Sequence, residues 1–211
     1  KLKMKNIELK SSETNPSFIE GWMMDDINLC DELINFFETN KDKHKVGESY
    51  SGLDKNIKDS IDLPILPKDL NDNSYFPVNK YMGHLDKCYK EYLLKYEITK
   101  HFKEMHIGPF NLQKYKQSGH FNGLHSERMG ISSSSRLFAW MTYLNDVNDG
   151  GETDFHFFKM KIKPKKGLTL IWPSEWTHMH RGSITNETKY IITGWMHFPD
   201  NLGDNKNIKG R

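Results

Sequence analysis

The predicted fold depends most on the stretch Arg136-Leu-Phe-Ala-Trp-Met-Thr-Tyr-Leu144, which is followed by the turn residues Asp146–Gly151. This stretch has the pattern of a β-strand, and from Phe110 onward it is one of several short β segments separated by turn signals. Seven strands at near-regular spacing indicate a sandwich or a barrel. We expect them near 110–117, 121–127, 136–144, 153–162, 168–172, 178–184 and 188–198.

The first hundred residues have a different period. Apolar residues recur at intervals of three and four between Val78 and Tyr96, which predicts a long helix. A shorter helix is expected from Asp26, a candidate N-cap, to about Glu38. Residues 40–76 lie between them and are polar, with glycine and proline, so we expect a long loop. Helices followed by strands indicate one α+β domain, mainly β, with helices packed on a sheet.

The composition is typical of a soluble chain with a sizeable core. Aromatic residues make up 12% of the 211 residues, too many for a disordered chain. The net charge of +2 excludes a strongly basic nucleic-acid binder, but not a local basic patch. No apolar run approaches the roughly 18 residues of a membrane span.

Two features bear on where the protein is found. Cys30 and Cys88 lie in apolar helical patterns, so we expect reduced core thiols and a cytoplasmic location. No secretory signal is visible, and Met4 is a candidate start of the natural chain.

His125-Ser-Glu127 is the first sign of chemistry. Side chains two positions apart on a strand share a face, so the imidazole and the carboxylate are expected to point the same way. His180 lies on another predicted strand. Two histidines and one carboxylate can occupy one face of an octahedral metal, as in non-haem Fe(II) oxygenases. Alone the pattern is weak in a chain with 10 histidines, and an ordinary exposed strand is the alternative.

Further stretches in a fixed order make the pattern specific. After His125-x-Glu127 they are Arg136-Leu-Phe-Ala-Trp-Met-Thr-Tyr-Leu-Asn-Asp146, Gly150-Gly-Glu-Thr-Asp-Phe155, Lys163-Pro-Lys-Lys-Gly167, Trp172-Pro, His180-Arg-Gly182 and Lys189-Tyr-Ile-Ile-Thr-Gly-Trp195. From Tyr115 to Phe198 the chain resembles the prolyl-4-hydroxylase-like branch of the 2-oxoglutarate/Fe(II) dioxygenases, in particular phage-encoded, viral members. Residues 1–110 match that family only in being helical.

The resemblance implies a double-stranded β-helix, a jelly-roll barrel of the cupin type, with N-terminal support helices. We expect a single domain over 1–211, with a helical and loop support region at 1–109, the catalytic core at 110–198 and a tail at 199–211.

The resemblance also implies that His125, Glu127 and His180 hold Fe(II). The family usually has Asp where Glu127 stands, so this longer carboxylate either ligates the ion directly or acts through a water. We favour direct ligation, because an unpaired carboxylate among the ligands would be costly. His178 shares a predicted strand face with His180 and is the alternative ligand. The offset from His180 to Lys189 favours His180.

The remaining site residues also follow from the resemblance. Lys189 is expected to bind the distal carboxylate of the co-substrate 2-oxoglutarate, where many relatives use Arg. Thr193 and Trp195 share its strand face, Thr193 as a second donor and Trp195 as a pocket wall or plain core. Tyr115 and Tyr143 match positions whose hydroxyls reach the co-substrate, with ordinary strand aromatics as the alternative. Arg136 matches an arginine at the mouth of the site, where it either contacts substrate or pairs with a surface carboxylate.

The expected activity is hydroxylation by O2 with 2-oxoglutarate, with ascorbate as a candidate reductant. The substrate is a peptide, a protein or a small molecule, and family analogy favours a peptidyl proline. Demethylation or desaturation would use the same ligands. A jelly-roll metal- or ligand-binding module without turnover is the alternative from another class. Nucleic-acid and membrane partners are not expected, and the sequence does not indicate an oligomeric state.

The polar segment 40–76 has a predicted role as well. Part of it, around 49–62, is expected near the metal mouth as a lid that becomes ordered when substrate binds. A solvated connector far from the site is the alternative.

Overall fold

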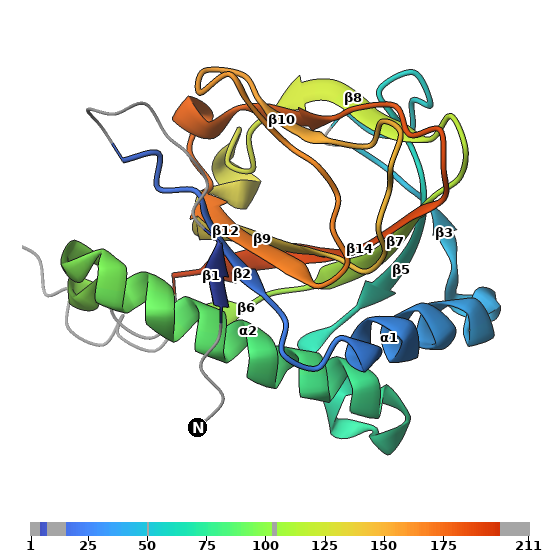
Figure 1. Ribbon diagram of the computed structural model, residues 1–211, viewed down its shortest axis with the longest axis horizontal. Helices are drawn as coiled ribbons and strands as arrows, with labels where there is room; N and C mark the ends of the chain where they lie inside the picture. Colours follow the sequence, from blue (N-terminus) through green and yellow to red (C-terminus); the bar gives the residue numbers. More distant parts are fainter. Residues whose placement is uncertain (1–4, 8–15, 50, 103–104, 199–211) are drawn as a thin grey trace, which may run out of the picture.

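Two antiparallel β-sheets face each other in the computed structural model, which describes residues 5–7, 16–49, 51–102 and 105–198. Two long helices lie together below the larger sheet in Figure 1, and the smaller sheet lies on the side away from them. The arrangement is the predicted jelly-roll, the double-stranded β-helix. It places two walls of strands around an interior that can hold a site.

The larger sheet contains strands from both halves of the chain. In spatial order they are β1 (Lys5–Ile7), β2 (Glu20–Met23), β12 (Leu168–Pro173), β9 (Arg136–Tyr143), β14 (Lys189–His197), β7 (Phe110–Tyr115), β5 (Ile61–Ile65) and β3 (Lys45–Val46), with β6 (His106–Ile107) also pairing with β14. The smaller sheet has the order β11 (Met160–Ile162), β10 (Thr153–Phe155), β13 (His180–Gly182), β8 (His120–His125) and β4 (Lys58–Asp59).

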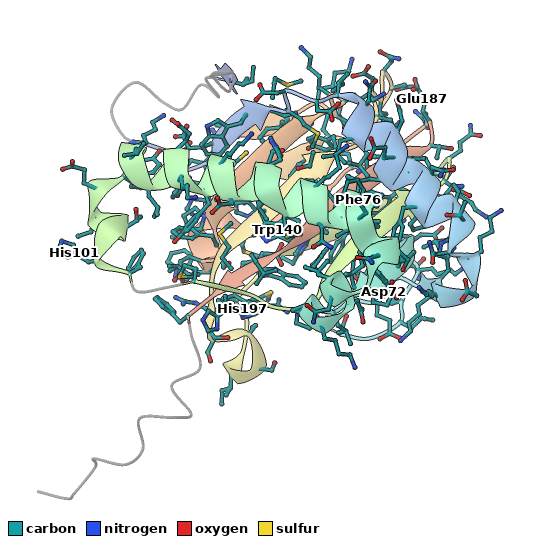
Figure 2. All side chains as sticks on the ribbon, turned by 90° about the horizontal axis from the view of Figure 1, so that it is seen from below. Asp72, Phe76, His101, Trp140, Glu187 and His197 are labelled. Atoms are coloured by element: carbon teal, nitrogen blue, oxygen red, sulfur yellow. The ribbon has the colours of Figure 1, made fainter. Side chains whose placement is uncertain are left out.

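The helices α1 (Asn28–Thr39) and α2 (Phe76–Lys95) cover the outer face of the larger sheet, as the apolar stripes predict. Figure 2 shows α2 crossing this sheet near Trp140. The rings of Tyr81 and Trp140 pack 5.7 Å apart, and those of Tyr92 and Phe138 pack 5.0 Å apart. Cys30 and Cys88 are free, buried thiols of this layer, as expected. Among the described helices, none is both long and apolar enough to cross a membrane.

Short 3-10 turns join these elements. They are η1 (Lys41–Lys43), η2 (Pro67–Asn71), η3 (Asn73–Tyr75), η4 (Glu97–His101), η5 (Ile131–Ser133) and η6 (Trp176–His178). A second apolar cluster lies inside the barrel and includes Met141, Tyr143, Phe155, Trp172 and Ile191. This inner cluster supports the walls of the cavity described below.

Five of the seven predicted strands agree with β7, β8, β9, β12 and β14 to within a few residues. The predicted strand 153–162 is wrong as a single element, because residues 156–159 form a turn and β10 and β11 pair as a hairpin. The predicted strand 178–184 is too long. His178 belongs to η6, and β13 begins at His180.

The expectation of a long loop over 40–76 is wrong. Three strands in this segment join the barrel, since β5 pairs with β7 and β3, and β4 pairs with β8. Strands β1 and β2, in the region expected to be helix and loop, also went unpredicted. These strands are short, and β2, β4 and β5 pair with strands that lie far away along the chain. The expected tail 199–211 lies outside the described residues, and the domain limits stay a prediction.

Candidate active site

The three predicted metal ligands meet where β8 and β13 run side by side. His125 is the last residue of β8, and it is the register partner of His180 at the start of β13. Glu127 follows two residues later, just beyond the strand end and not inside the strand as predicted. Its Oε1 lies 3.2 Å from His180 Nε2 and 3.8 Å from His125 Nε2. One ligand atom from each residue lies within 4.8 Å of the others, so a single ion can contact all three.

Backbone carbonyls orient both imidazoles. His125 Nδ1 lies 2.8 Å from the carbonyl oxygen of Gly123, and His180 Nδ1 lies 2.9 Å from that of His178. A carbonyl oxygen only accepts hydrogen bonds, so each ring carries its proton on Nδ1. The Nε2 lone pairs then face Glu127 Oε1, which is the arrangement of ligating histidines. Three lone pairs converging on one point repel one another unless a cation lies between them, so the donor set fits a divalent metal.

The electrostatics keep these groups in their ligating forms. Burial alone would raise the pKa of Glu127, but interactions with the imidazoles of His180 and His125 in their protonated forms, and the Trp195 N–H, outweigh it and hold that pKa at about 2. Burial, together with the neighbouring His180, lowers the pKa of His125 to about 4. At neutral pH the carboxylate is therefore an anion and the His125 imidazole is neutral. The aromatic ring of Phe121 stacks on His125 with centroids 3.9 Å apart and helps to shield the site.

Lys189 lies on the wall of the same cavity, which has a volume of about 740 Å³. Its side chain is 3% exposed, and Nζ donates to the carbonyl oxygen of Gly151 at 3.0 Å and lies 4.6 Å from the ring of Tyr115. Gly150 and Gly151 turn the chain at φ +74° and +73°, which glycine adopts readily. Within the described part of the chain, no carboxylate reaches ion-pair distance of Lys189.

This buried cation is set up to receive an anion. Burial lowers the pKa of Lys189 to about 8, and the charge of Glu152 only partly opposes the shift. A buried ammonium without a counter-charge is costly, and an anionic ligand would remove that cost. The cavity therefore combines a cluster that could hold a metal, at the histidines, with a buried cation on the Lys189 wall that could receive an anion.

Comparisons with known proteins agree with this geometry. Residues 110–197 match the family model described as the 2OG-Fe(II) oxygenase superfamily. This segment belongs to that superfamily. "Probable prolyl 4-hydroxylase 9" of Arabidopsis thaliana is 28% identical over 122 residues, 45% of this chain and 42% of the plant protein. "Prolyl 4-hydroxylase 13" of the same plant is 23% identical over 129 residues, 48% of this chain and 47% of its own. The alignments thus cover less than half of each plant protein.

Solved prolyl hydroxylases share the fold of this chain. The viral collagen prolyl hydroxylase of Paramecium Bursaria Chlorella virus-1, solved with 2OG, matches with a TM-score of 0.62 and 20% identity, over 86% of this chain and 97% of that one. A Pseudomonas putida prolyl-4-hydroxylase matches with a TM-score of 0.67 and 13% identity, over 86% and 93% of the two chains. Both likenesses extend beyond residues 110–197 and include much of the support region.

The two tyrosines predicted to reach the co-substrate differ in position. Tyr115 lines the cavity beside Lys189, and its hydroxyl donates to Gln113 at 2.8 Å. Tyr143 is fully buried and does not line the cavity. Its hydroxyl lies 2.6 Å from Thr153 Oγ1, and Thr153 does line the cavity. Any influence of Tyr143 on a ligand would pass through Thr153, and both predicted roles stay predictions.

Thr193, Trp195 and Arg136 all line the cavity, and each has a partner within the protein. Thr193 Oγ1 donates to the carbonyl oxygen of Trp140 at 2.9 Å. Trp195 Nε1 donates to Glu127 Oε2 at 2.7 Å, so the indole orients the carboxylate as well as forming a wall. Arg136 lies 3.6 Å from the Trp195 ring centroid and donates to the backbone carbonyl of Glu127 at 2.9 Å.

These contacts bear on two alternatives, a surface ion pair of Arg136 and His178 as a metal ligand. Arg136 supports Glu127 and makes no pair with a surface carboxylate in the described chain, and its role toward substrate stays a prediction. His178 points away from the metal ligands, because its Nε2 bonds the carbonyl oxygen of Ser17 at 2.8 Å. The geometry therefore favours His180 over His178 as the ligand.

The sequence analysis did not predict an ion pair that lies on the cavity wall. Lys58 Nζ pairs with Asp62 Oδ2 at 2.7 Å, and Gln113 Nε2 donates to the same oxygen at 3.0 Å. Lys58 lies on β4 and Asp62 on β5, so the pair joins the two sheets. No sequence signal could have found it, since both residues lie in the segment predicted to be a loop. The cavity lining confirms that this segment borders the mouth, whereas its ordering by substrate stays a prediction.

Proposed function

We propose that the chain is an Fe(II)- and 2-oxoglutarate-dependent dioxygenase that hydroxylates a peptide, with a prolyl residue as the favoured target. One observation carries the proposal: a histidine–carboxylate–histidine cluster and a buried, uncompensated lysine lie on the walls of one cavity. When bound, Fe(II) with 2-oxoglutarate and O2 supplies the oxidation of an unreactive C–H bond. In this proposal His125, Glu127 and His180 hold the ion, and Lys189 binds the distal carboxylate of the co-substrate.

The protein's own residues contribute orientation and exclusion of water. Trp195 holds the second oxygen of Glu127, which leaves Oε1 for the ion. Phe155 and Trp172 pack around His180 with ring centroids 5.3 and 5.2 Å away, and Phe121 covers His125. Such walls restrict water near the ligands and so limit side reactions. Direct ligation by Glu127 is supported by the Trp195 bond, because that bond aims one carboxylate oxygen at both imidazoles.

A peptide substrate is supported by the mouth of the cavity and by one structural relative. Residues of several separate segments form the rim, including Val46, Ser49, Leu124 and Met129. A Trichoplax adhaerens prolyl hydroxylase, solved in complex with a hypoxia inducible factor peptide fragment, matches with a TM-score of 0.67 and 13% identity, over 87% of this chain and 85% of that one. We propose that this chain likewise takes an extended peptide, with O2 as oxidant and ascorbate keeping the iron reduced.

Succinate release tests the activity, and mass spectrometry tests the substrate. The protein is incubated with Fe(II), 2-oxoglutarate and ascorbate, with and without a library of proline-containing peptides. We expect succinate in both cases, more of it with an accepted peptide, and a peptide heavier by one oxygen atom. His180→Ala serves as the inactive control. Metal binding without succinate under any condition would instead support a non-catalytic binding module.

A further inference from the structure

Four lysines repeat at every second position along one exposed edge of the molecule. Lys159, Lys161, Lys163 and Lys165, hereafter the lysine ladder, are all exposed, whereas the intervening Ile162 and Pro164 are buried. Where the chain is extended, as in β11, this repeat puts successive lysines about 6.6 Å apart on one side, while Lys159 lies in the turn that precedes the strand. β11 is the last strand of the smaller sheet, and neither long helix covers that sheet (Figure 1). The lysine ladder is therefore open to a partner along its length.

The charge of the ladder is not neutralised by its surroundings. Among the described residues, none of the four lysines forms an ion pair. The register partner of Lys161 is Asp154, and this carboxylate is already paired with Arg181 at 3.1 Å. Asp146, at the other side of the ladder, accepts the backbone N–H of Lys166 at 2.9 Å. The edge thus presents a local excess of positive charge in a chain whose net charge is only +2.

Two exposed aromatic rings stand at the end of the lysine ladder. Phe157 lies in the turn between β10 and β11 and is 54% exposed, and Trp176 in η6 is 65% exposed. Their ring centroids are 6.2 Å apart in an edge-to-face arrangement. One shallow hollow of about 620 Å³ is lined by Phe157, Lys159 and Lys161, together with His156 and the Asp154 that pairs with Arg181. None of the residues lining this hollow lines the metal-site cavity, so the two are separate sites.

A simpler account explains only part of this surface. Lysines on an edge strand discourage unwanted strand pairing, and that role would suffice for the charge alone. It does not explain Phe157 and Trp176, because exposed aromatic rings favour association. Lys159 also adopts φ +50°, a backbone conformation usual for glycine or asparagine, so the lysine is kept at a conformational cost.

We propose that the lysine ladder, with Phe157 and Trp176, binds single-stranded nucleic acid. The lysines would contact successive phosphates, and the two rings would stack with bases at the hairpin tip. A cationic track beside aromatic platforms is the usual design for binding single strands without sequence preference. An acidic polypeptide would satisfy the lysines, but only a nucleic acid combines a charge on every repeating unit with a flat ring that can stack, so a nucleic acid is the better fit.

Fluorescence anisotropy with the full chain tests the proposal. The probes are labelled oligothymidylate and oligouridylate of about 15 nucleotides, titrated at several salt concentrations. Four phosphate contacts predict a log–log salt slope of about −3, since each contact on a single strand contributes about −0.7. We expect Lys161→Gln/Lys163→Gln to weaken binding at least tenfold and to reduce the slope by about 1.4. Trp176→Leu should weaken binding about tenfold without changing the slope, since one stacked base is lost.

The matched control is Lys68→Gln/Lys87→Gln, which removes two exposed lysines on the helical side of the molecule. It should leave binding unchanged, and both double variants should keep wild-type succinate release without oligonucleotide. Equal losses in the two double variants, or no binding by the wild type, would overturn the proposal. Displacement of the probe by polyglutamate as readily as by unlabelled oligonucleotide would also overturn it, in favour of an acidic polypeptide.

Discussion

The two ends of the cavity differ in how their polar groups are held. At the His180 end, three ligand atoms converge and neighbouring groups hold them in place. At the Lys189 wall, a single ammonium has no carboxylate within ion-pair distance among the described residues. Carbonyl oxygens fix both imidazoles, and Trp195 fixes the second oxygen of Glu127. Among the described residues, Lys189 Nζ contacts only the carbonyl of Gly151 and the ring of Tyr115. The first arrangement attracts a cation and the second attracts an anion. A ligand that contacts both must chelate a metal with one end and present a negative charge at the other.

The largest expected effect comes from removing a metal ligand. His180→Ala should weaken Mn(II) binding more than about 100-fold, because even partners of ligands are worth 10- to 100-fold. Calorimetric titration of the metal-free protein measures this change. His178→Ala is the matched control and should bind Mn(II) almost normally, since its ring faces Ser17. Equal affinities in the two variants would remove His180 from the ligand set.

The next effect separates the anion site from the metal site. Lys189→Ala should raise the 2-oxoglutarate concentration needed for succinate release roughly 10- to 100-fold, because a charge-assisted contact contributes about 1.5–3 kcal/mol. Mn(II) affinity should change little. Lys114→Ala is a suitable control, since Lys114 lies on the neighbouring strand but pairs with Glu38. An unchanged 2-oxoglutarate titration in Lys189→Ala would refute the anion site.

A smaller effect tests how the carboxylate is held. Trp195→Phe keeps a ring for Arg136 to stack on but removes the donor to Glu127 Oε2, so Mn(II) affinity should fall about tenfold. In a Glu127→Asp background the same change should cost little, because the shorter side chain no longer reaches the indole. If the two losses were equal in both backgrounds, Trp195 would act through packing and not through the hydrogen bond.

The pH dependence gives the mildest test. Lys189 must be protonated to bind an anion, and burial lowers its pKa to about 8 from the ordinary lysine value of 10.5. Below pH 8 the ammonium form predominates, and 2-oxoglutarate affinity should be nearly constant. Above pH 8 each bound anion must also recruit a proton, so affinity should fall by up to about tenfold per pH unit. Calorimetry of the Mn(II)-loaded protein between pH 7 and about 9 measures it, with Lys189→Ala as the pH-independent control.

The sequence grouped the candidate site residues better than it predicted the strands around them. His125, Glu127, His180 and Lys189 follow from motifs with fixed spacing, and the structure brings them to one cavity. The hydrogen bonds of Trp195 and Arg136 to Glu127 could not be predicted from the sequence, because they join β14 and β9 to a residue past the end of β8. Only the packed barrel brings these three segments together.

The strands of segment 40–76 could not be predicted from the sequence for a similar reason. Strand β5 contains Pro64, and β3 and β4 are two residues long, so each resembles a loop by local pattern. Strands β5 and β4 pair with β7 and β8, which lie about fifty and sixty residues further along the chain, and β3 then pairs with β5. This pairing supplies the stability that local propensity lacks. Strand formation here is a property of the assembled sheet.

One measurement tests most directly whether the cavity binds a metal at the histidines and an anion at Lys189. It compares the binding of 2-oxoglutarate and 2-oxovalerate to the Mn(II)-loaded protein, because 2-oxovalerate lacks the distal carboxylate. The wild type should prefer 2-oxoglutarate about 10- to 100-fold, and Lys189→Ala should bind both keto acids equally and weakly. A preference of the same size in the wild type and in Lys189→Ala would contradict the account, since the distal carboxylate would then be recognised elsewhere.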